Sequence, residues 1–176
     1  MSTNNHDSFE ELDDPVSTGH APTKISSGIS IIAGGTVVLA LGGGTGSVVA
    51  FMGVFLIGLG LYANSRRPVS IGAFLLLAGV LLAGLSGQSP GPLVLGMITT
   101  VIAWDVGEHA ITVGEQLGRN APTTRLELTH AIGTAVAGIL TAGIGVTIFR
   151  FATGGQPVAA LVFLLAAALA FIVAIQ

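Results

Sequence analysis

The chain has 176 residues, of which 51% are hydrophobic and only 9% are charged, and its formal net charge at pH 7 is -3. A soluble domain usually carries about a quarter charged residues, so this composition excludes an ordinary water-soluble fold and indicates that lipid is the solvent. The absence of cysteine excludes disulfides and thiolate chemistry, and the few basic residues form no patch of the kind that binds nucleic acid.

The first segment, residues 1–23, is polar and acidic and has almost no large apolar side chain. It cannot bury enough surface to offset the entropy of ordering, so we predict a disordered cytoplasmic tail. An acidic start also lacks the positive region of a secretory signal. The first helix is therefore expected to act as an uncleaved anchor. The acidic residues are Asp7, Glu10, Glu11, Asp13 and Asp14.

The rest of the chain, residues 24–176, consists of apolar blocks broken by glycine clusters, proline and arginine. Each block approaches the roughly 20 residues that a helix needs to cross the hydrocarbon core. We predict an all-α, polytopic transmembrane bundle with about six spanning helices, at residues 25–41, 47–62, 69–86, 92–112, 126–149 and 156–175. Only a glycine-rich turn at residues 42–46 separates the first two, so one long broken segment is the alternative there.

Positively charged residues predict the orientation, because Lys and Arg collect on the cytoplasmic side of short loops. A cytoplasmic tail leaves only Arg150 facing outward. The sequence therefore predicts a multi-pass protein of the cell membrane with both termini in the cytoplasm. The cations on the cytoplasmic side would be Lys24, Arg66, Arg67, Arg119 and Arg125.

The fourth predicted helix carries most of the ionisable groups within the apolar blocks, toward its end. Steps of three and four residues place Asp105, Glu108, Thr112, Glu115 and Arg119 on one stripe. Trp104, just before this stripe, could mark the start of a surface helix. We expect instead one continuous helix whose last turns emerge into the cytoplasm.

The fifth predicted helix begins with a second polar edge that contains Glu127 and His130. An antiparallel hairpin around residues 120–124 would bring Arg119 opposite Glu127, and His130 toward Glu115 or Thr112. The resulting polar cluster near the inner leaflet comprises Asp105, Glu108, His109, Glu115, Arg119, Glu127 and His130.

Three interpretations of this polar cluster remain open. Its members can pair across the hairpin and so lower the cost of placing charge near lipid. They can form an ion or proton site, because carboxylates and histidines at membrane depth exchange protons with nearby water. A metal or catalytic site is the third interpretation. Asp105 with His109 and Glu127 with His130 have ligand spacings, but only the second pair fits the Glu-x-x-His pattern of di-metal bundles, so we expect neither metal nor cofactor.

Small residues at regular spacing indicate where helices approach closely. In the third predicted helix Gly72, Gly79 and Ser86 recur every seven residues, and in the last one Ala159, Ala166 and Ala170 form a similar stripe. Close packing explains both stripes.

Three stretches in the second half, WDVGEHAITVGEQLGR, NAPTTRLELTHAIG and GGQPVAALVFLL, resemble a family of small haloarchaeal membrane proteins of unknown function. The first half matches more loosely, through its helix pattern. Members tend to be encoded beside a MoxR-type AAA ATPase and a von Willebrand-like domain protein. The resemblance therefore implies a membrane component of a chaperone-like assembly. It assigns no catalytic residue.

Two functions follow as expectations. The leading one is a non-enzymatic membrane subunit or scaffold that docks a cytoplasmic partner, because the sequence has no recognisable nucleophile, nucleotide loop or complete metal set. The alternative is a small ion or proton transporter that uses the polar cluster. Transporter sites usually lie near the bilayer midplane, whereas this cluster is predicted toward one surface.

Overall fold

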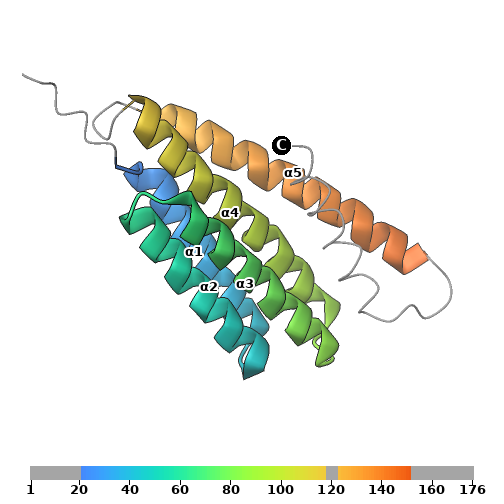
Figure 1. The fold of residues 1–176 in the computed structure, drawn as a ribbon. Coiled ribbons are helices and arrows are strands. Elements are labelled where there is room, and N and C mark those ends of the chain that lie inside the picture. Colours follow the sequence, from blue (N-terminus) through green and yellow to red (C-terminus); the bar gives the residue numbers. More distant parts are fainter. Residues whose placement is uncertain (1–20, 118–122, 152–176) are drawn as a thin grey trace, which may run out of the picture.

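The computed structural model describes residues 21–117 and 123–151, and within these ranges it contains α-helices and no strand (Figure 1). Each helix is long and apolar enough to cross a membrane, which confirms a helix at five of the six predicted positions. The sixth span, at residues 156–175, and residues 1–20 of the predicted tail lie outside the described residues. The helices are α1 (Lys24–Leu41), α2 (Gly44–Tyr62), α3 (Arg66–Leu85), α4 (Pro90–Leu117) and α5 (Thr124–Phe151).

Short connections make consecutive helices antiparallel neighbours (Figure 1). Between α1 and α2 the chain reverses at Gly42 and Gly43, whose φ angles of 66° and 117° suit glycine. The alternative of one long broken helix is therefore wrong. This alternation brings the start of α1, the start of α3, the end of α4 and the start of α5 to the same end of the bundle. We call it the charged end, because it carries Lys24, Arg66, Arg67, Glu115 and Arg125.

Helices α2 and α3 meet backbone against backbone. Gly46 faces Gly79, and Gly53 faces Gly72, so closely that an added Cβ would lie 2.5–2.6 Å from the opposite carbonyl oxygen. The predicted small-residue stripe on α3 is thus a packing surface, met by glycines with the same seven-residue spacing on α2. Ser86 takes no part in this surface, because it is exposed just beyond the end of α3.

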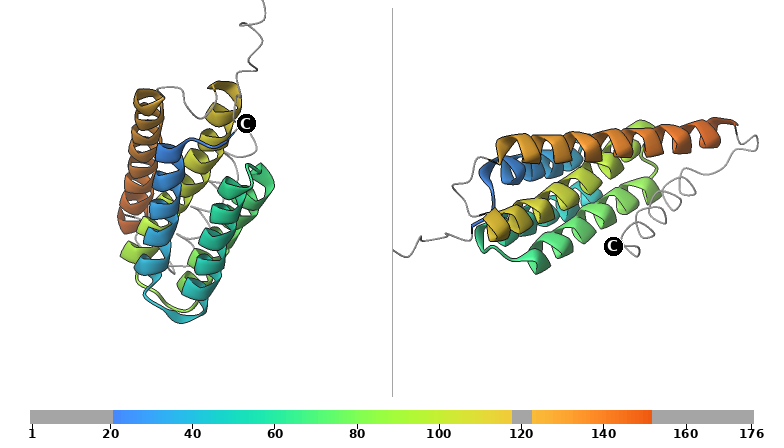
Figure 2. Two further views of the ribbon diagram at one scale, coloured as in Figure 1. Left: turned by 90° about the vertical axis from the view of Figure 1, so that its left-hand side faces the viewer. Right: turned by 90° about the horizontal axis from the view of Figure 1, so that it is seen from above.

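The four helices α1–α4 share one core, and α5 lies outside it. Val37, Ile57, Leu76 and Leu93, one from each of these helices, are completely buried. The most apolar stretches of α1–α4 are 33% to 44% buried, whereas that of α5 is only 11% buried. Figures 1 and 2 show α5 along the outside of the bundle, where it contacts α4 and α1.

Candidate functional site

Helix α4 continues without a break past Trp104 to Leu117. The Trp104 indole N–H donates to Glu108, one turn further on, at 3.1 Å. The predicted continuous helix is confirmed, and the possible transition to a separate surface helix at Trp104 is excluded. All the polar residues of α4 therefore lie on one continuous helix.

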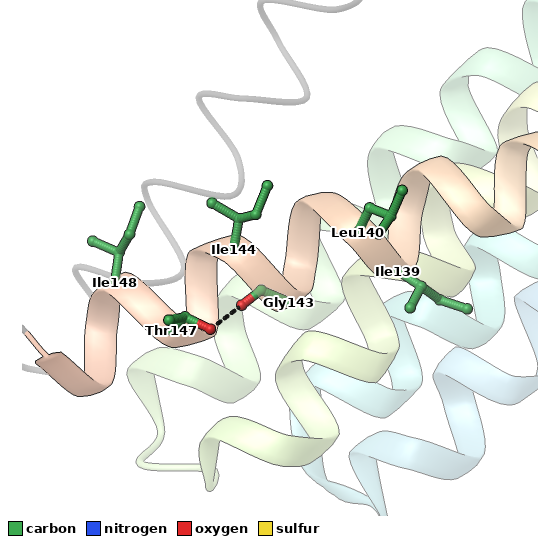
Figure 3. A pocket seen from close by; sticks show the side chains of 6 residues that line it. All are labelled: Ile139, Leu140, Gly143, Ile144, Thr147 and Ile148. Carbon is green, nitrogen blue, oxygen red and sulfur yellow. Dashed lines mark hydrogen bonds between the residues drawn. The ribbon is translucent and has the colours of Figure 1, made fainter.

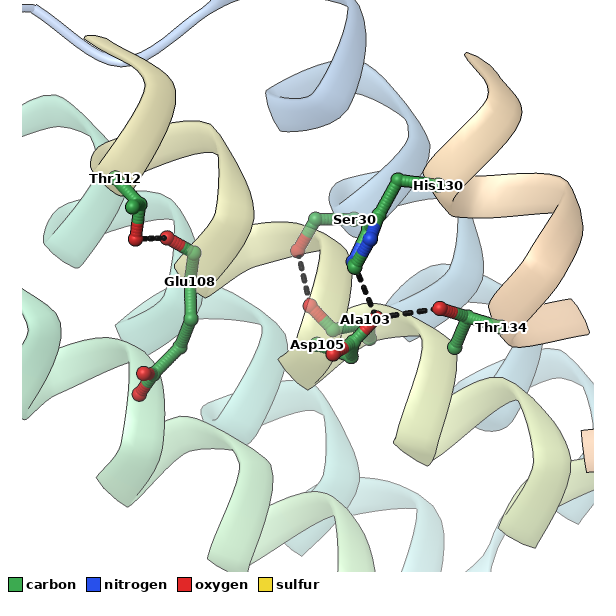
Figure 4. Close-up of polar contacts among 7 residues, drawn as sticks. All are labelled: Ser30, Ala103, Asp105, Glu108, Thr112, His130 and Thr134. Carbon is green, nitrogen blue, oxygen red and sulfur yellow. Dashed lines mark hydrogen bonds and ion pairs between the residues drawn. The ribbon is translucent and has the colours of Figure 1, made fainter. Parts of the chain in front are cut away.

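The contact between α4 and α5 contains a carboxylate, a hydroxyl and two imidazoles; Figure 4 shows Asp105, Thr134 and His130. His130 Nε2 lies 2.8 Å from Asp105 Oδ2, and the Thr134 hydroxyl donates to the same carboxylate oxygen. The rings of His109 and His130 stack with their centroids 3.9 Å apart and their planes at 11°. We call these four residues the histidine site. It lies within the bundle, and its Asp105 and His130 side chains are 28% and 35% exposed.

The sequence-based prediction for His130 is wrong. It expected this side chain beside Thr112 or Glu115, but His130 lies against Asp105 and His109, three to ten residues further from the connection. Helix spacing specifies which residues share a face, but it does not specify how far two antiparallel helices slide past each other. That register depends on contacts with a third element, here α1.

Glu127 turns away from α4 toward the start of α1. Its carboxylate accepts the backbone N–H and the hydroxyl of Ser26, both at 2.8 Å, and the hydroxyl of Thr123. Glu127 is only 2% exposed. The first N–H groups of a helix have no partner within that helix, and Thr23, at the N-cap position, makes no side-chain capping bond. Glu127 therefore caps α1 from a distant part of the chain. Its predicted partner Arg119 lies outside the described residues.

The other two carboxylates of α4 face α3. The Ser70 hydroxyl donates to Glu108 at 2.6 Å, and Arg66 pairs with Glu115 at 2.7 Å. The single predicted stripe is therefore two stripes, one toward α5 and one toward α3. At 3.6 residues per turn, a step of three residues places Glu108 about 60° around the helix from Asp105, which is enough to aim the two side chains at different neighbours.

Hydroxyl residues complete the polar contacts, and the sequence-based cluster did not include them. Ser26 binds Glu127, and the hydroxyl of Ser30 donates to the carbonyl oxygen of Ala103 at 2.5 Å (Figure 4). One signal was available, because Ser26 and Ser30 lie one turn apart on the buried face of a largely apolar helix. Such a pair indicates a polar neighbour, although it does not identify which one.

The residue pairs considered as metal ligands do not converge. Glu127 binds at the start of α1, whereas His130 lies against Asp105 on α4. Within residues 21–117 and 123–151, no group of three or more histidines and carboxylates is arranged to hold a metal ion. The histidine site instead places the Asp105 carboxylate 2.8 Å from His130 Nε2, although neither this nitrogen nor His109 Nε2 has a partner with hydrogen-bond geometry among the described residues.

Comparison with known proteins finds one family. The model of a family of unknown function, DUF7519, matches residues 20–172, a range that includes all five described helices. No curated protein and no solved structure matches the chain. Comparison therefore assigns no ligand, partner or functional residue.

Proposed function

Since the chain belongs to the DUF7519 family, whose function is unknown, we propose its role from its geometry: a non-enzymatic subunit or scaffold of the cell membrane that binds a cytoplasmic protein at the charged end. The lipid bilayer surrounds its apolar outer faces, which carry many exposed large hydrophobic side chains.

The observation that carries this proposal is the separation of exposed charge. Among the described residues of the charged end, the cations Lys24, Arg66, Arg67 and Arg125 are exposed together with one carboxylate, Glu115. Arg150 is the only exposed charged residue at the opposite end of the described helices. An excess of exposed cations attracts a partner with an acidic surface and steers its approach.

Helix α4 adds a projecting element to this end. Thr23, just before α1, donates its backbone N–H to the carbonyl oxygen of Ala110. Residues 111–117 of α4 therefore continue past the start of α1 by about 10 Å, at 1.5 Å per residue. The exposed side chains of Glu115, Gln116 and Leu117 lie on this extension, where a soluble protein can reach them.

The internal polar groups support a structural role for the rest of the cluster. Asp105, Glu108 and Glu127 each accept a hydroxyl hydrogen bond from a neighbouring helix or from the segment before α5. Polar groups within a membrane are costly unless they are paired in this way. The proposed scaffold thus uses its internal carboxylates to fix the helices and its exposed charges to bind.

The proposed orientation places the charged end and both termini in the cytoplasm, in keeping with the positive-inside rule. Single cysteines at Asn64, between α2 and α3, and at Gln88, between α3 and α4, test it in intact cells. A membrane-impermeant maleimide should label the cysteine at Gln88 and leave the one at Asn64 unlabelled. The reverse pattern would contradict the orientation.

Co-purification tests the proposed partner, for which the sequence resemblance suggests a MoxR-type AAA ATPase assembly. We expect Arg67→Glu combined with Arg125→Glu to abolish recovery of the partner, because both changes reverse charge on the binding surface. Arg150→Glu, at the opposite end, is the matched control and should retain the partner. Equal recovery with all three proteins, or equal loss from both variants, would contradict the proposal.

A proton or ion transporter is the second candidate, favoured by the stacked His109 and His130 beside Asp105. Histidine exchanges protons near neutral pH. The scaffold proposal expects reconstituted protein to show no proton or cation flux above empty liposomes. Flux that is lost in both Asp105→Asn and His109→Gln would instead support transport through the histidine site.

A further inference from the structure

The outer face of α5 is apolar and has no helix against it among the described residues. It consists of Ile139, Leu140, Gly143, Ile144, Thr147 and Ile148, which line a shallow pocket (Figure 3). Ile144 and Leu140 are each 62% exposed. A Cβ built at Gly143 meets no described atom within 4 Å, in contrast to the glycines between α2 and α3. This face therefore has both the apolar surface and the small residue that a packed helix requires.

The chain supplies a matching segment directly after α5. Every residue from Val158 to Ile175 is apolar, so residues 156–175 can cross the hydrocarbon core as a helix. The segment is also rich in alanine, which permits close approach of two helix backbones. Pro157 suits the first turn of such a helix, where its missing N–H costs nothing.

The connection limits where this segment can lie. Only residues 152–155, of sequence Ala-Thr-Gly-Gly, separate α5 from it, and four residues reach at most about 14 Å. Packed helices have axes about 8–10 Å apart, so a short connection places consecutive helices side by side. Each consecutive pair of described helices in this protein is in contact.

We propose that residues 156–175 form a helix that runs antiparallel to α5 and packs on its outer face, with Gly143 near the centre of the contact. Position along the helices follows from the connection. Ile144 lies eight residues before residue 152, and Phe163 lies eight residues after residue 155, so these two positions are level. This inference is independent of the proposed function, because it concerns only how the bundle is completed.

Paired cysteines test the contact directly, since the natural chain contains none. Ile144→Cys is combined in turn with a cysteine at Leu161, Val162, Phe163 or Leu164, which together cover one full helical turn. After oxidation in native membranes, we expect at least one pair to form an intramolecular disulfide in most molecules. Blocked maleimide labelling, restored by reduction, is the measurement.

Phe51→Cys provides the matched control. Phe51 is exposed on α2, seven residues from Gly44, just as Ile144 lies seven residues from Phe151 at the same end of the bundle. Helices α2 and α5 are not neighbours within the described residues. Phe51→Cys combined with the same four partners should therefore form no intramolecular disulfide.

Two other occupants of the outer face of α5, a second copy of the chain and lipid, would give different results in the disulfide experiment. If a second copy of the chain covers it, Ile144→Cys alone forms a disulfide-linked dimer and the four pairs give no intramolecular product. If lipid covers it, neither product forms. Either result overturns the proposal, provided that the proteins insert and purify as the wild type does.

A second measurement does not depend on disulfide geometry. Gly143→Leu inserts a large side chain into the proposed contact and should lower the thermal unfolding midpoint of the purified protein. Gly35→Leu, on α1 near the same end, is the control, because a Cβ there also meets no described atom within 4 Å. It should leave the midpoint unchanged or higher. Equal midpoints for the two variants would overturn the proposal.

Discussion

Two helix pairs in this bundle are held together by opposite means. Helices α2 and α3 bring their backbones together at paired glycines, whereas α4 and α5 are joined through a carboxylate, a threonine and two histidines. In lipid the hydrophobic effect does not drive helices together, so association depends on close packing or on interhelical hydrogen bonds. Close packing of glycines extends along the length of α2 and α3, but the polar contacts of α5 are confined to its first part.

The largest expected loss of stability concerns the glycine pairs between α2 and α3. In Gly53→Ala the new methyl group would lie 2.6 Å from the carbonyl oxygen of Gly72 and 2.9 Å from the backbone nitrogen of Leu76. Neither backbone atom can move without separating the helices. We expect the free energy of unfolding to fall by about 3 kcal/mol, at the upper end for overpacked cores. Chemical unfolding in mild detergent measures it.

The matched control lies in the same helix. Gly58→Ala meets only a side-chain carbon of Ile31, at 3.6 Å, which is ordinary contact. Replacing glycine by alanine within a helix gains up to about 1 kcal/mol of helix propensity. Gly58→Ala should therefore be neutral or stabilising. Similar losses in both variants would show that α2 and α3 do not depend on close backbone approach.

The second prediction concerns Glu127 as the cap of α1. Glu127→Ala leaves the Ser26 N–H without its acceptor, and losing a charged hydrogen-bond partner of a buried group costs about 2–3 kcal/mol. Hydrogen exchange at residues 24–27 should become faster, while exchange at the start of α2 should not change. Unchanged exchange at residues 24–27 would mean that α1 is capped by another group.

The third prediction concerns the pairing of Asp105 with Thr134. Thr134→Val keeps the shape and removes the hydroxyl, so we expect a loss of about 1 kcal/mol, the net value of a typical hydrogen bond. A double-mutant cycle with Asp105→Ala should give a coupling energy of similar size. Additive losses would show that the two side chains do not interact, and the polar description of the α4–α5 contact would fail.

The smallest loss of stability is expected when the ion pair between Arg66 and Glu115 is broken. These side chains are 49% and 41% exposed, and such ion pairs contribute about 0–1 kcal/mol. Arg66→Ala should therefore lower stability only slightly, and the loss should shrink as salt screens the pair. A loss larger than that of Thr134→Val would contradict this ranking of the polar contacts.

The sequence predicted the helices better than it predicted their contacts. Hydropathy located five helices to within five residues at each end, because a helix that crosses lipid must be apolar over a fixed length. The sequence also predicted that four cations lie at the same end of the bundle, because the number of helices between them is known. They are Lys24, Arg66, Arg67 and Arg125. These features depend on local composition and on the number of crossings.

The candidate site was predicted only in part. The contact between Asp105 and His130 could not be predicted from the sequence, because it depends on how far α5 is shifted along α4. The hydrogen bonds between Ser26 and Glu127 could not be predicted either, because they join residues that are 101 positions apart in the sequence. One-dimensional spacing identifies the face on which a residue lies, whereas packing against a third helix determines what that face meets.

The capping of α1 by Glu127 has a consequence for how the protein is made. Helix α1 is synthesised before α5, so its cap arrives only about a hundred residues later. Until then the first turn of α1 relies on water or lipid headgroups for its free N–H groups. If α5 crossed the membrane in the opposite direction, Glu127 and Ser26 would lie on opposite sides of the bilayer, so Ser26 would lose this acceptor and Glu127 would keep only the hydroxyl of Thr123. This contact therefore forms only in chains in which the starts of α1 and α5 lie on the same side of the membrane.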